Sequence, residues 1–581
     1  MSQFKLRNPD VKTISQIVQA NTGMDESTLL DPFLLVFPVA NMDKAAQKVL
    51  EAQKQRRRIY VFGDYDVDGI CSSYILTALL NEVFYRGARV RLPYRFSEGY
   101  GCSPEAIDEF EDNGLLILID NGIVAYDAIN KAKAKGMSVI VIDHHLPKLD
   151  DAGKPVLPDA DIIVDPHVFP GEFNEYCAGG LALKFAAEYL FLISRTQGFD
   201  FFKNKPTADL YSGFQAVAAI ATISDSVSLT FENRKIVREG IEVINKHPET
   251  LPRGLRVLIE KLELVGIVDE KAIGFKLGPC LNAPGRLYDE GAKKAFTLLY
   301  QDLSFKETIP VVEDILNDNE IRKQFCSDWF EAAKIEIEAG QMQEDYPIVL
   351  AIPRIPEGVI GIIAGKVAEA FKTPAIVLSD DGTGDCKGSA RTFGDVHIKE
   401  LLDLHSDLIV KYGGHAGAAG LTVKRENVDK LRKELNQSLG KKPKEIAADV
   451  YYDIEISKAD VSSVMAEVNR FKPYGEGNPA PVVLIRNLTL IPDGAEHYKI
   501  LNAGGLKLNA GNVTGISFDC TDKYLAMGTP SKVDLVGTLS QSFFRGNITN
   551  QIEFTDIEAS EAATQKTALQ MALEKRALER V

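Results

Sequence analysis

Residues 61–70 read VFGDYDVDGI, an apolar strand pattern that runs into three aspartates, Asp64, Asp66 and Asp68, at every second position. Three ionised carboxylates this close together repel one another, and burying even one of them without a partner costs free energy. The stretch is therefore either a solvated turn or a place where cations bind among the carboxylates. The rest of the chain decides between these two explanations.

The stretch opens a series of alternating strand and helix patterns. Strands are predicted at 59–66, 88–95, 115–120, 137–143 and 161–167, and helices at 72–85, 103–113 and 124–136. Strands that alternate with helices of about ten to fifteen residues indicate a parallel α/β sheet. In such sheets ligands bind beyond the carboxyl ends of the strands, which is where the aspartates lie.

The remaining sequence predicts three further parts. Residues 177–345 have a mostly helical pattern, with 311–340 a long connecting helix. A second α/β unit begins with a strand at 346–353, continues as a helix at 358–371 and returns as a strand at 374–379. The turn-rich stretch PYGEGNP (473–479) indicates a boundary, the short alternating segments after it are typical of a small β-barrel or sandwich, and the tail from 561 has a polar helical pattern.

Composition narrows the class of protein. A chain of 581 residues is long enough for two to four domains, and 45% hydrophobic with 25% charged residues is typical of a soluble globular protein. No run of about 18 apolar residues occurs, so we expect a cytoplasmic protein without a membrane anchor. Seven scattered cysteines without a CxxC pair argue against a disulfide framework or a structural zinc site.

The net charge of −16 argues against generic, charge-driven binding to nucleic acid. A nucleic-acid enzyme is still compatible with this charge, because a local basic groove or bound metal ions can accommodate a polyanion.

Potential metal ligands also follow other predicted elements. Asp120 ends the third strand, Asp143, His144 and His145 end the fourth, and Asp225 follows the apolar run FQAVAAIATIS. Carboxylates mixed with imidazole suit Mn²⁺, or Mg²⁺ where oxygen ligands dominate. Two such ions about 3.5–4 Å apart form a recognised arrangement for cleaving phosphoesters. The sequence therefore predicts a dinuclear metal site, which explains the crowded aspartates.

Each of these residues also has an ordinary structural explanation. A DxD sequence in a turn is usually solvated, Asp120 before Asn-Gly fits turn chemistry, and an adjacent pair of histidines or an aspartate at a helix end commonly has no metal. Taken separately, these explanations do not account for ligand-type residues at the ends of strands and helices throughout one α/β domain.

The motifs GDYDVDG (63–69), IDNG (119–122), IDHH (142–145) and SDSVSL (224–229) resemble the four motifs of the DHH phosphoesterase superfamily. Farther along, GPCLNAPGRL (278–287), GVIGIIAGKVAEAF (358–371), GSARTF (388–393) and YGGHAGAAGLTV (412–423) resemble its RecJ branch, which carries a DHHA1 domain. LLDPF (29–33), MDKAAQKVLEA (42–52) and PYGEGNPAP (473–481) extend the resemblance over about residues 29–560.

The resemblance implies an order of domains. After an N-terminal segment (1–55), we expect a parallel-sheet DHH domain at 56–310, a connecting helix at 311–344 and a smaller α/β DHHA1 domain at 345–445. An OB-like β-barrel domain is expected at 446–560 and a helical tail at 561–581.

The resemblance also implies roles for the residues at the site. Two Mn²⁺ or Mg²⁺ ions would be held by Asp66, Asp68, Asp120, His144 and Asp225, with Asp120 as the bridging ligand. Asp64 and Asp143 would orient ligands and water. His145 would lie near the scissile phosphate, and His415, from the second domain, would complete the catalytic set.

A 5′-phosphate would be bound by a further set of residues, which consists of Arg95, Arg286, Ser389, Arg391 and Gly414. Arginine suits this task because its planar fork contacts two phosphate oxygens, although surface arginines in ordinary salt bridges are the alternative explanation. Glycines in the loop GGHAGAAG let backbone N–H groups approach a phosphate closely. The chain departs from the family at Phe62, where some members carry a histidine ligand, and at Cys280 and Pro284 before Arg286.

Together these features predict a metal-dependent exonuclease that degrades single-stranded DNA from the 5′ end to mononucleotides, in DNA recombination, repair or replication. We expect a monomer, with a single-strand-binding protein or a helicase as candidate partners. The β-rich segment is not strongly basic, so its hold on a strand would come from stacking on Tyr498, Phe518, Phe543 or Phe544, unless these side chains belong to the core.

The ligand set alone supports only hydrolysis of a phosphoester or phosphoanhydride, and the polarity and the DNA substrate come from the resemblance. One alternative is a phosphodiesterase of the same superfamily for short oligonucleotides or cyclic dinucleotides, against which the extra β-rich domain argues. A second is a non-catalytic replication or scaffold protein, against which the presence of every expected ligand argues.

Overall fold

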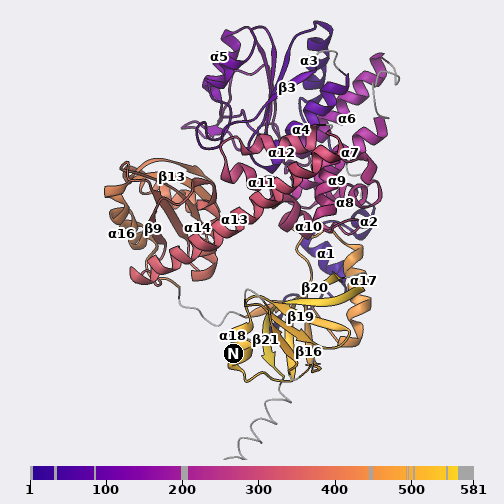
Figure 1. Ribbon diagram of the computed structural model, residues 1–581, viewed down its shortest axis with the longest axis vertical. Coiled ribbons are helices and arrows are strands. Elements are labelled where there is room, and N and C mark those ends of the chain that lie inside the picture. The colour runs from indigo at the N-terminus through magenta and orange to yellow at the C-terminus, as the bar shows by residue number, and fades with distance from the viewer. Residues whose placement is uncertain are drawn as a thin grey trace, which may run out of the picture. The chain divides into compact units, whose positions relative to one another are not determined.

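The computed structural model describes residues 4–31, 36–83, 87–197, 207–301, 303–443, 449–492, 494, 496–501, 504–544 and 547–560. Contacts divide the chain into two compact units. Figure 1 colours the chain by residue number. Unit 1 consists of Met1–Val36, Ser228–Lys235 and Glu445–Val581, and unit 2 of Phe37–Val227 and Ile236–Lys444. None of the described helices combines the length and the apolar character needed to cross a membrane. The tail predicted to be helical from 561 lies outside the described residues.

Unit 2 contains a five-stranded sheet in which every strand pair is parallel, as the sequence predicted. The strand order is β3 (Ala88–Arg91), β2 (Ile59–Phe62), β4 (Leu115–Ile119), β5 (Ser138–Ile142) and β8 (Ile162–Val164). Both faces of the sheet are covered, because Ile59 and Val61 of β2 join one apolar core while Tyr60 and Phe62 join another. Helices α3 (Met42–Lys54), α4 (Val67–Val83) and α6 (Ala178–Gln197) lie on the first face, and α5 (Tyr126–Ala134) on the second (Figure 1).

The order of the strands creates a crevice at the carboxyl edge of this sheet. The chain passes from β2 to β3 on one side and then to β4 on the other side of β2. Loops that leave neighbouring strands in opposite directions open a crevice, and ligands of α/β sheets bind there. The opening aspartates follow β2 and Asp120 follows β4, so both stretches lie at this point.

Two helices predicted in the first α/β part differ from the structure. Helix α4 starts at Val67, five residues before its predicted start, and so includes Asp68 in its first turn. The first turn of α4 packs against the backbone of Asp64. This contact requires a glycine at position 69, because a Cβ there would lie only 2.6 Å from the backbone nitrogen of Asp64. The helix predicted at 103–113 is a single 3₁₀ turn, η2 (Ala106–Glu109), since the acidic residues of this segment gather toward its carboxyl end, where the helix dipole disfavours them.

The region between the two α/β sheets of unit 2 is helical, as predicted. It contains α7 (Thr207–Ser224), α8 (Phe231–Lys246), α9 (Arg253–Lys261), α10 (Glu270–Ala272), the π-helical turn η5 (Ile273–Leu277), α11 (Gly278–Leu287), α12 (Gly291–Tyr300) and α13 (Phe305–Ala339). The long helix α13 begins six residues before its predicted start, because Ser304 and Glu307 form a capping box there.

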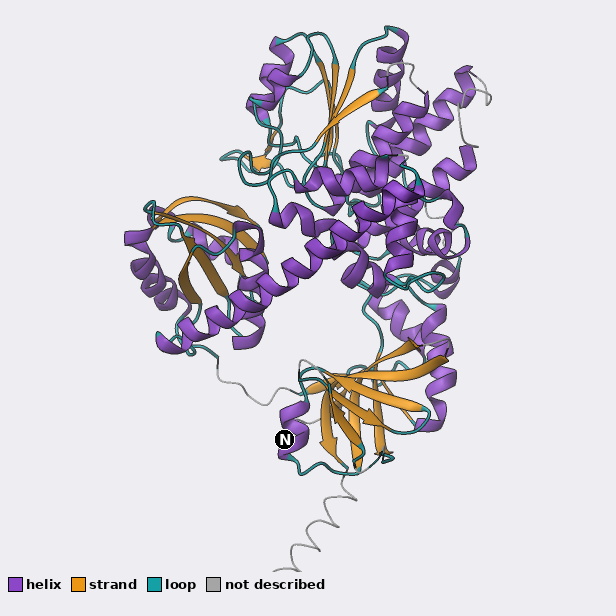
Figure 2. Ribbon diagram, in the orientation of Figure 1, coloured by secondary structure: helices purple, strands orange, loops and turns teal. Residues whose placement is uncertain are grey.

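The second sheet of unit 2 is mixed, and Figure 2 shows its strands with helices packed beside them. Its order is β12 (Ile409–Gly414), β13 (Ala418–Lys424), β11 (Asp385–Arg391), β10 (Ala375–Asp380) and β9 (Ile348–Pro353). Only β9 and β10 are parallel to each other. Helix α14 (Glu357–Phe371) connects them, as predicted, and α15 (Ile398–Asp403) and α16 (Val428–Leu439) complete this part.

Unit 1 is built on a seven-stranded mixed sheet. Its order is β15 (Ile454–Ile456), β16 (Val482–Thr489), β20 (Lys532–Phe544), β21 (Asn547–Ala559), β19 (Val513–Ser517), β18 (Leu506–Asn509) and β17 (Tyr498–Ile500). Helices α17 (Val461–Arg470) and α18 (Thr521–Ala526) belong to the same unit. The stretch 473–479, expected to mark a boundary, lies inside unit 1 between α17 and β16.

The first residues of the chain also belong to unit 1, which the sequence did not indicate. Strand β1 (Phe4–Leu6) pairs in parallel with β14 (Val450–Tyr452). Residues of α1 (Ile14–Thr22) and α2 (Glu26–Leu30) share an apolar core with α17 and the sheet.

A buried arginine ties together distant segments of unit 1. Arg234 has no exposed surface, and its guanidinium donates to the carbonyl oxygens of Phe471, Lys472 and Pro473 at 2.8, 3.2 and 2.9 Å. A longer bond of 3.4 Å reaches the carbonyl of Leu29. One side chain thus satisfies backbone acceptors of the N-terminal helices and of the turn after α17.

Replacing Arg234 by Met should therefore destabilise unit 1. Each buried carbonyl left without a donor costs about 1–3 kcal/mol, so we expect the free energy of unfolding to fall by at least about 2 kcal/mol. Because the single tryptophan, Trp329, lies in unit 2, the measurement is hydrogen exchange of peptides from 450–560 in increasing urea. Lys507→Met, at an exposed position of β18, is the control, and equal protection in the two variants would contradict the prediction.

Candidate metal centre

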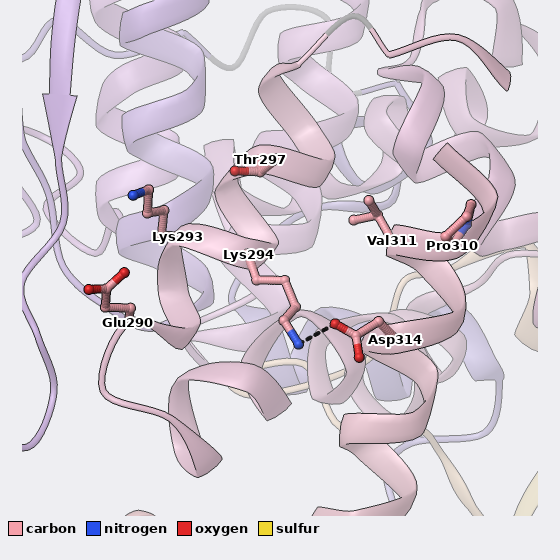
Figure 3. Close-up of a pocket in the computed structure, with 7 residues that line it drawn as sticks. All are labelled: Glu290, Lys293, Lys294, Thr297, Pro310, Val311 and Asp314. Carbon is pink, nitrogen blue, oxygen red and sulfur yellow. Dashed lines mark ion pairs between the residues drawn. The ribbon is translucent and has the colours of Figure 1, made fainter. Parts of the chain in front are cut away.

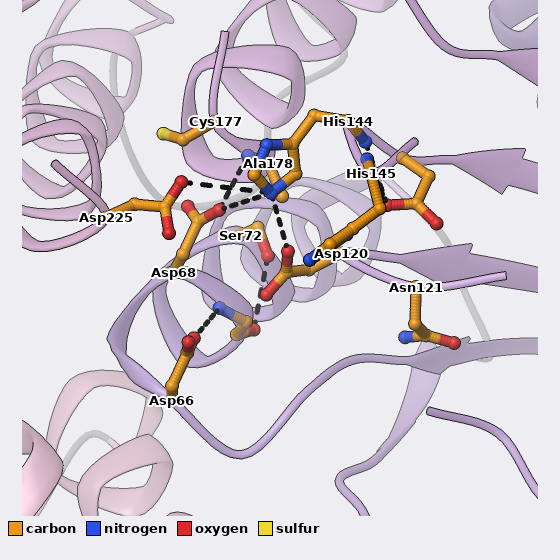
Figure 4. A network of polar contacts seen from close by, with 12 residues as sticks. Asp66, Asp68, Ser72, Asp120, Asn121, His144, His145, Cys177, Ala178 and Asp225 are labelled. Atoms are coloured by element: carbon orange, nitrogen blue, oxygen red, sulfur yellow. Dashed lines mark hydrogen bonds and ion pairs between the residues drawn. The ribbon is translucent and has the colours of Figure 1, made fainter. Parts of the chain in front are cut away.

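Six ligand-type side chains converge at the carboxyl edge of the parallel sheet. Figure 4 labels five of them: Asp66, Asp68, Asp120, His144 and Asp225. Asp64 and Asp66 come from the loop after β2 and Asp68 from the first turn of α4, whereas Asp120 follows β4, His144 follows β5 and Asp225 follows α7. The sequence predicted this convergence, and the structure brings together all five residues that were assigned as metal ligands.

His144 lies at the centre of the cluster. Its Nε2 is 3.1 Å from Oδ1 of Asp120, 3.5 Å from Oδ2 of Asp68 and 3.9 Å from Oδ2 of Asp225. One donor atom from each of Asp68, His144 and Asp225 lies within 4.8 Å of the others, which is close enough to share one ion.

Asp120 belongs to two further sets of three residues whose donor atoms lie within 4.8 Å of one another. One joins it to Asp64 and Asp66, and the other joins it to His144 and His145. A carboxylate that belongs to neighbouring groups is placed to bridge two ions, which is the role predicted for Asp120. The backbone of Asp120 has a φ of 62°, so the strand ends in a sharp turn that keeps its side chain at the edge of the sheet.

Helix α6 orients Asp68 through its first backbone amides. Oδ2 of Asp68 accepts a hydrogen bond from the N–H of Ala178 and Oδ1 accepts one from that of Gly179, both at 2.7 Å. The positive end of the helix dipole also favours a carboxylate at this place. Residues 178 and 179 carry no polar side chain, so no sequence signal indicated this contact.

Asp143 is fully buried, and both of its oxygens accept hydrogen bonds from the protein. Oδ2 accepts from the N–H of Ile123, and Oδ1 accepts from the N–H groups of His144 and His145. Oδ1 also lies 2.8 Å from Nδ1 of His145. These bonds place Asp143 where it can position the two histidines, and the orienting role that the resemblance implied for it stays a prediction.

Asp143 and His145 each stabilise the charged form of the other. Burial lowers the pKa of His145, but the hydrogen bond and charge of Asp143 outweigh it and raise this pKa to about 9. Burial opposes ionisation of Asp143, but the bond and charge of His145 outweigh it and lower the pKa of Asp143 to about 2. Asp143 therefore favours the imidazolium form of His145.

Sequence analysis did not identify Tyr100 as part of the site. Its hydroxyl donates to the backbone oxygen of Asp120 at 3.1 Å and lies 3.0 Å from Nδ1 of His145, while its side chain is partly exposed. Its place in the glycine-rich turn SEGYG, close to Arg95, was the only available signal.

The donor set fits divalent cations. Burial first, and then repulsion from neighbouring carboxylates, raises the pKa of Asp68 to about 6, that of Asp225 to about 9, and that of Asp120 well above its usual range. Oδ1 of Asp64 is buried and has no hydrogen-bond partner in the described structure. Burial and the charge of His145 lower the pKa of His144 to about 3, so its neutral imidazole keeps a lone pair for a metal. Cations among these groups would relieve all of these costs.

Three of the five residues predicted to bind a 5′-phosphate, Arg286, Ser389 and Arg391, lie against helix α14. Nη1 of Arg286 donates to the carbonyl of Gly358 at 3.1 Å, and Nη1 of Arg391 lies 2.6 Å from Oγ of Ser389. A Cβ on Gly361 would lie 2.7 Å from Nη2 of Arg391, so this arginine packs directly on the helix.

Arg95 comes from the loop after β3. Its guanidinium lies over the ring of Tyr65 at 4.4 Å, and its Nη1 is buried without a hydrogen-bond partner in the described structure. An unused buried donor of this kind is suited to a phosphate oxygen.

The glycine-rich loop GGHAGAAG (413–420) of the second sheet is closely packed. Gly414 has a φ of 151°, and a Cβ there would lie 2.2 Å from the carbonyl oxygen of Ala418. His415 is exposed, and its Nδ1 accepts from the N–H of Gly417 at 3.2 Å. Among the described residues it makes no hydrogen bond to the acidic cluster, so its part in catalysis stays a prediction.

The positions where the chain departs from the family are all buried. Phe62 and Cys280 have no exposed surface, and Pro284 lies within α11 two residues before Arg286. Phe62 therefore belongs to the core of the sheet.

Three family models match consecutive parts of the chain. They are the DHH family N-terminal domain at 58–211, the DHHA1 domain at 345–441 and the RecJ OB domain at 452–556. The single-stranded-DNA-specific exonuclease RecJ of Salmonella typhimurium is 30% identical over 544 residues, which cover 89% of this chain and 90% of that protein. The chain belongs to the RecJ family.

Other RecJ proteins support this assignment. The Bacillus subtilis single-stranded-DNA-specific exonuclease RecJ is 32% identical over 90% of this chain, which spans 64% of that relative's length. The crystal structure of RecJ from Thermus thermophilus in complex with Mn²⁺ matches with a TM-score of 0.76 and 25% identity, over 95% of this chain and 76% of that one.

Replacing a shared ligand and replacing a positioning residue should have different effects. Asp120→Ala should lower Mn²⁺ affinity and phosphodiester hydrolysis by orders of magnitude, whereas Asp143→Ala should cost about 10–100-fold. Without metal, Asp120→Ala should be at least as stable as the wild type, because carboxylate repulsion is relieved. Calorimetric titration with Mn²⁺, a nuclease assay and thermal unfolding measure these effects. Near-normal metal binding by Asp120→Ala would refute the shared-ligand assignment.

Proposed function

We propose that this protein is a metal-dependent exonuclease that degrades single-stranded DNA from the 5′ end to mononucleotides. The observation that carries the proposal is the cluster of carboxylates around His144, in which Asp120 belongs to neighbouring metal-sized groups. Membership of the RecJ family, whose Salmonella member is named a single-stranded-DNA-specific exonuclease, supports the choice of substrate.

Asp66, Asp68, Asp120, His144 and Asp225 would hold two Mn²⁺ or Mg²⁺ ions, with Asp120 shared. When bound, the ions would supply a nucleophile from water at neutral pH and neutralise charge on the attacked phosphate. The carboxylate of Asp64 lies in one group with Asp66 and Asp120, so it offers an additional oxygen donor as well as an orienting contact.

His145 contributes a positive charge beside these ligands. Asp143 holds its Nδ1–H, which leaves the Nε2–H of the imidazolium to donate to an oxygen of the scissile phosphate. Tyr100, in contact with His145, restricts the orientation of this ring.

Direction of cleavage would come from recognition of the terminal phosphate. Arg95, Arg286 and Arg391 supply guanidinium groups, Ser389 a hydroxyl and Gly414 an approachable backbone. Binding a terminal phosphate at a fixed place selects which phosphodiester bond reaches the ions. The proposal extends to a monomer that acts in the cytoplasm, with a single-strand-binding protein or a helicase as partner, on the strength of the family alone.

Loss of one of these arginines should remove the preference for a 5′-phosphate. We expect Arg391→Gln to lower catalytic efficiency on a 5′-phosphorylated oligonucleotide by at least about tenfold, since a charge-assisted hydrogen bond contributes roughly 1.5–3 kcal/mol. Efficiency on a 5′-hydroxyl oligonucleotide should change little. Arg425→Gln, which removes an exposed ion pair with Asp380 in the same sheet, is the matched control.

End-labelled oligonucleotides blocked at the 3′ end measure both the preference and the direction. The block should not slow the wild type. If it stops degradation, or if the wild type ignores the 5′-phosphate, the proposed direction is wrong.

A second prediction concerns the binding of long single-stranded DNA by unit 1. Of the aromatic residues considered as stacking platforms, Phe518 is 70% exposed, whereas Tyr498 packs against Tyr524 with ring centroids 5.5 Å apart. The side chains of Phe543 and Phe544 lie outside the described residues. Phe518 is therefore the platform that the exposed surface favours.

Phe518→Ala should weaken binding of a long single strand by on the order of 1–3 kcal/mol, the usual contribution of one stacked base. Hydrolysis of a very short oligonucleotide should be unchanged. Fluorescence anisotropy with a labelled strand gives the affinity, and Leu525→Ala, at a partly exposed apolar position of the same unit, is the control. Equal affinities of the two variants would exclude stacking on Phe518.

A further inference from the structure

The chain passes from unit 2 into unit 1 shortly after Asp225, a proposed metal ligand. Contacts assign Phe37–Val227 and Ile236–Lys444 to unit 2, but they assign the inserted segment between them, Ser228–Lys235, to unit 1. The inserted segment begins three positions after Asp225. Its conformation can therefore affect the position of Asp225 along a very short stretch of chain.

The carboxylate of Asp225 has fewer fixed partners than the neighbouring carboxylates. Asp68 accepts hydrogen bonds from two backbone N–H groups and Asp143 accepts them from three. Within the described part of the chain, no hydrogen bond reaches the carboxylate of Asp225, whose Oδ2 lies 3.9 Å from Nε2 of His144 (Figure 4). The position of this carboxylate therefore depends on the backbone before and after it.

The backbone turns sharply at Asp225. Helix α7 ends at Ser224, and the N–H of Asp225 still donates to the carbonyl of Ala221 at 2.9 Å. The next residue, Ser226, has a φ of 58°, in the left-handed region that residues with a Cβ rarely adopt. A residue remains in this region only where the surrounding structure fixes it. The chain after Ser226 must therefore be held in place.

Leu229 of the inserted segment contacts the turn PYGEGNP (473–479) of unit 1. Its N–H donates to the carbonyl of Glu476 at 2.7 Å, and its side chain is buried. A Cβ on Gly475 would lie 2.7 Å from Cδ1 of Leu229, so the backbone of the turn lies directly against this side chain. The contact leaves no room for a larger residue at position 475.

Hydrogen bonds close this turn and connect it to a second point of the inserted segment. Gly475 and Asn478 donate to each other's carbonyl oxygens at 2.9 and 3.1 Å. Asn478 is fully buried, and its Nδ2 donates to the carbonyl of Pro473 at 2.8 Å. Arg234 of the inserted segment donates to the same carbonyl at 2.9 Å. The turn therefore holds the inserted segment at both Leu229 and Arg234.

We propose that the turn at 473–479 positions Asp225 for metal binding by holding the inserted segment in place. The turn acts along the chain: with Leu229 held, Ser226 keeps its left-handed conformation and the carboxylate of Asp225 stays beside His144. The inference rests on the proposed function, which makes Asp225 a metal ligand. Unit 1 then contributes to the metal centre as well as to the binding of a strand.

Gly475→Ala in the full-length protein tests the proposal, because the added methyl group would displace the side chain of Leu229 from the turn. The first measurement is hydrogen exchange of the metal-free protein, in peptides that cover 219–230. The second is calorimetric titration with Mn²⁺. We expect faster exchange of the amides at 225–229 and a Mn²⁺ affinity about tenfold lower, the lower end of the usual cost of losing a group that orients a metal ligand.

A double-mutant cycle with Leu229→Ala shows whether the effect passes through Leu229. Leu229→Ala alone loosens the same contact and should also lower Mn²⁺ affinity, so it provides the test if Gly475→Ala does not fold. Because Leu229→Ala makes room for the added methyl group, Gly475→Ala should cause no further loss of affinity in that background.

Two controls separate positioning from a general loss of stability. Gly528→Ala strains the backbone elsewhere in unit 1, since Gly528 has a φ of 75° and a Cβ there would meet no atom within 4 Å. Lys294→Met loosens unit 2 in the depression between α12 and α13 that Figure 3 shows, where Lys294 is paired with Asp314 at 2.5 Å and with Asp318 at 2.7 Å. Both controls should keep the Mn²⁺ affinity of the wild type.

Gly475→Ala with the Mn²⁺ affinity of the two controls would overturn the proposal, even if its exchange at 225–229 were faster. Additive losses of affinity in the cycle would overturn it as well. Failure of the proposed function is distinguishable, because it would show as wild-type protein that does not degrade single strands. Hydrogen exchange of the metal-free protein and Mn²⁺ binding do not depend on that activity.

Discussion

Repulsion among carboxylates at the carboxyl edge of a parallel sheet is the constraint on which the rest of unit 2 depends. Asp64, Asp68 and Asp120 are almost completely buried, and burial together with mutual repulsion raises the pKa of each. Chain segments with such groups remain in place only where the surrounding structure fixes them. The sheet meets this condition, because both of its faces are covered by apolar cores and its strand order places the loops after β2 and β4 side by side.

Hydrogen bonds from backbone N–H groups and from His145 offset part of this repulsion. These bonds are distributed unequally among the carboxylates. Asp68 receives two backbone N–H groups from α6, and Asp143 receives three together with the imidazole of His145. Asp64 keeps a buried oxygen without a partner. The carboxylates of Asp68 and Asp143 therefore have fixed orientations, whereas Asp64 retains a buried oxygen to which a cation could bind. The buried, closely spaced carboxylates therefore lower the stability of the fold at this place, as expected of a functional site.

The sequence predicted those parts of this arrangement that depend on local patterns. Apolar runs gave the strands of the parallel sheet, and ligand-type residues at their ends gave the metal cluster. It did not predict contacts between distant segments: the amides of Ala178 and Gly179 at Asp68, the hydroxyl of Tyr100 at His145, or the pairing of β1 with β14. Backbone amides carry no sequence signal, and a tyrosine in a turn has many possible partners. The helix predicted at 103–113 is a single 3₁₀ turn, because its acidic residues gather toward the carboxyl end, where the helix dipole disfavours them.

Charge distribution connects the metal cluster with the arginines around it. The chain has a net charge of −16, so a polyanionic substrate is repelled at long range and must be attracted locally. Elsewhere in unit 2, Lys294 is paired with Asp314 and Asp318. Near the cluster, Arg95 of the loop after β3 and Arg286 of α11 have no ion-pair partner within the described residues. Positive charge is therefore left unmatched where a phosphate would arrive, and an acidic protein can hold a strand at its reactive end without a basic surface.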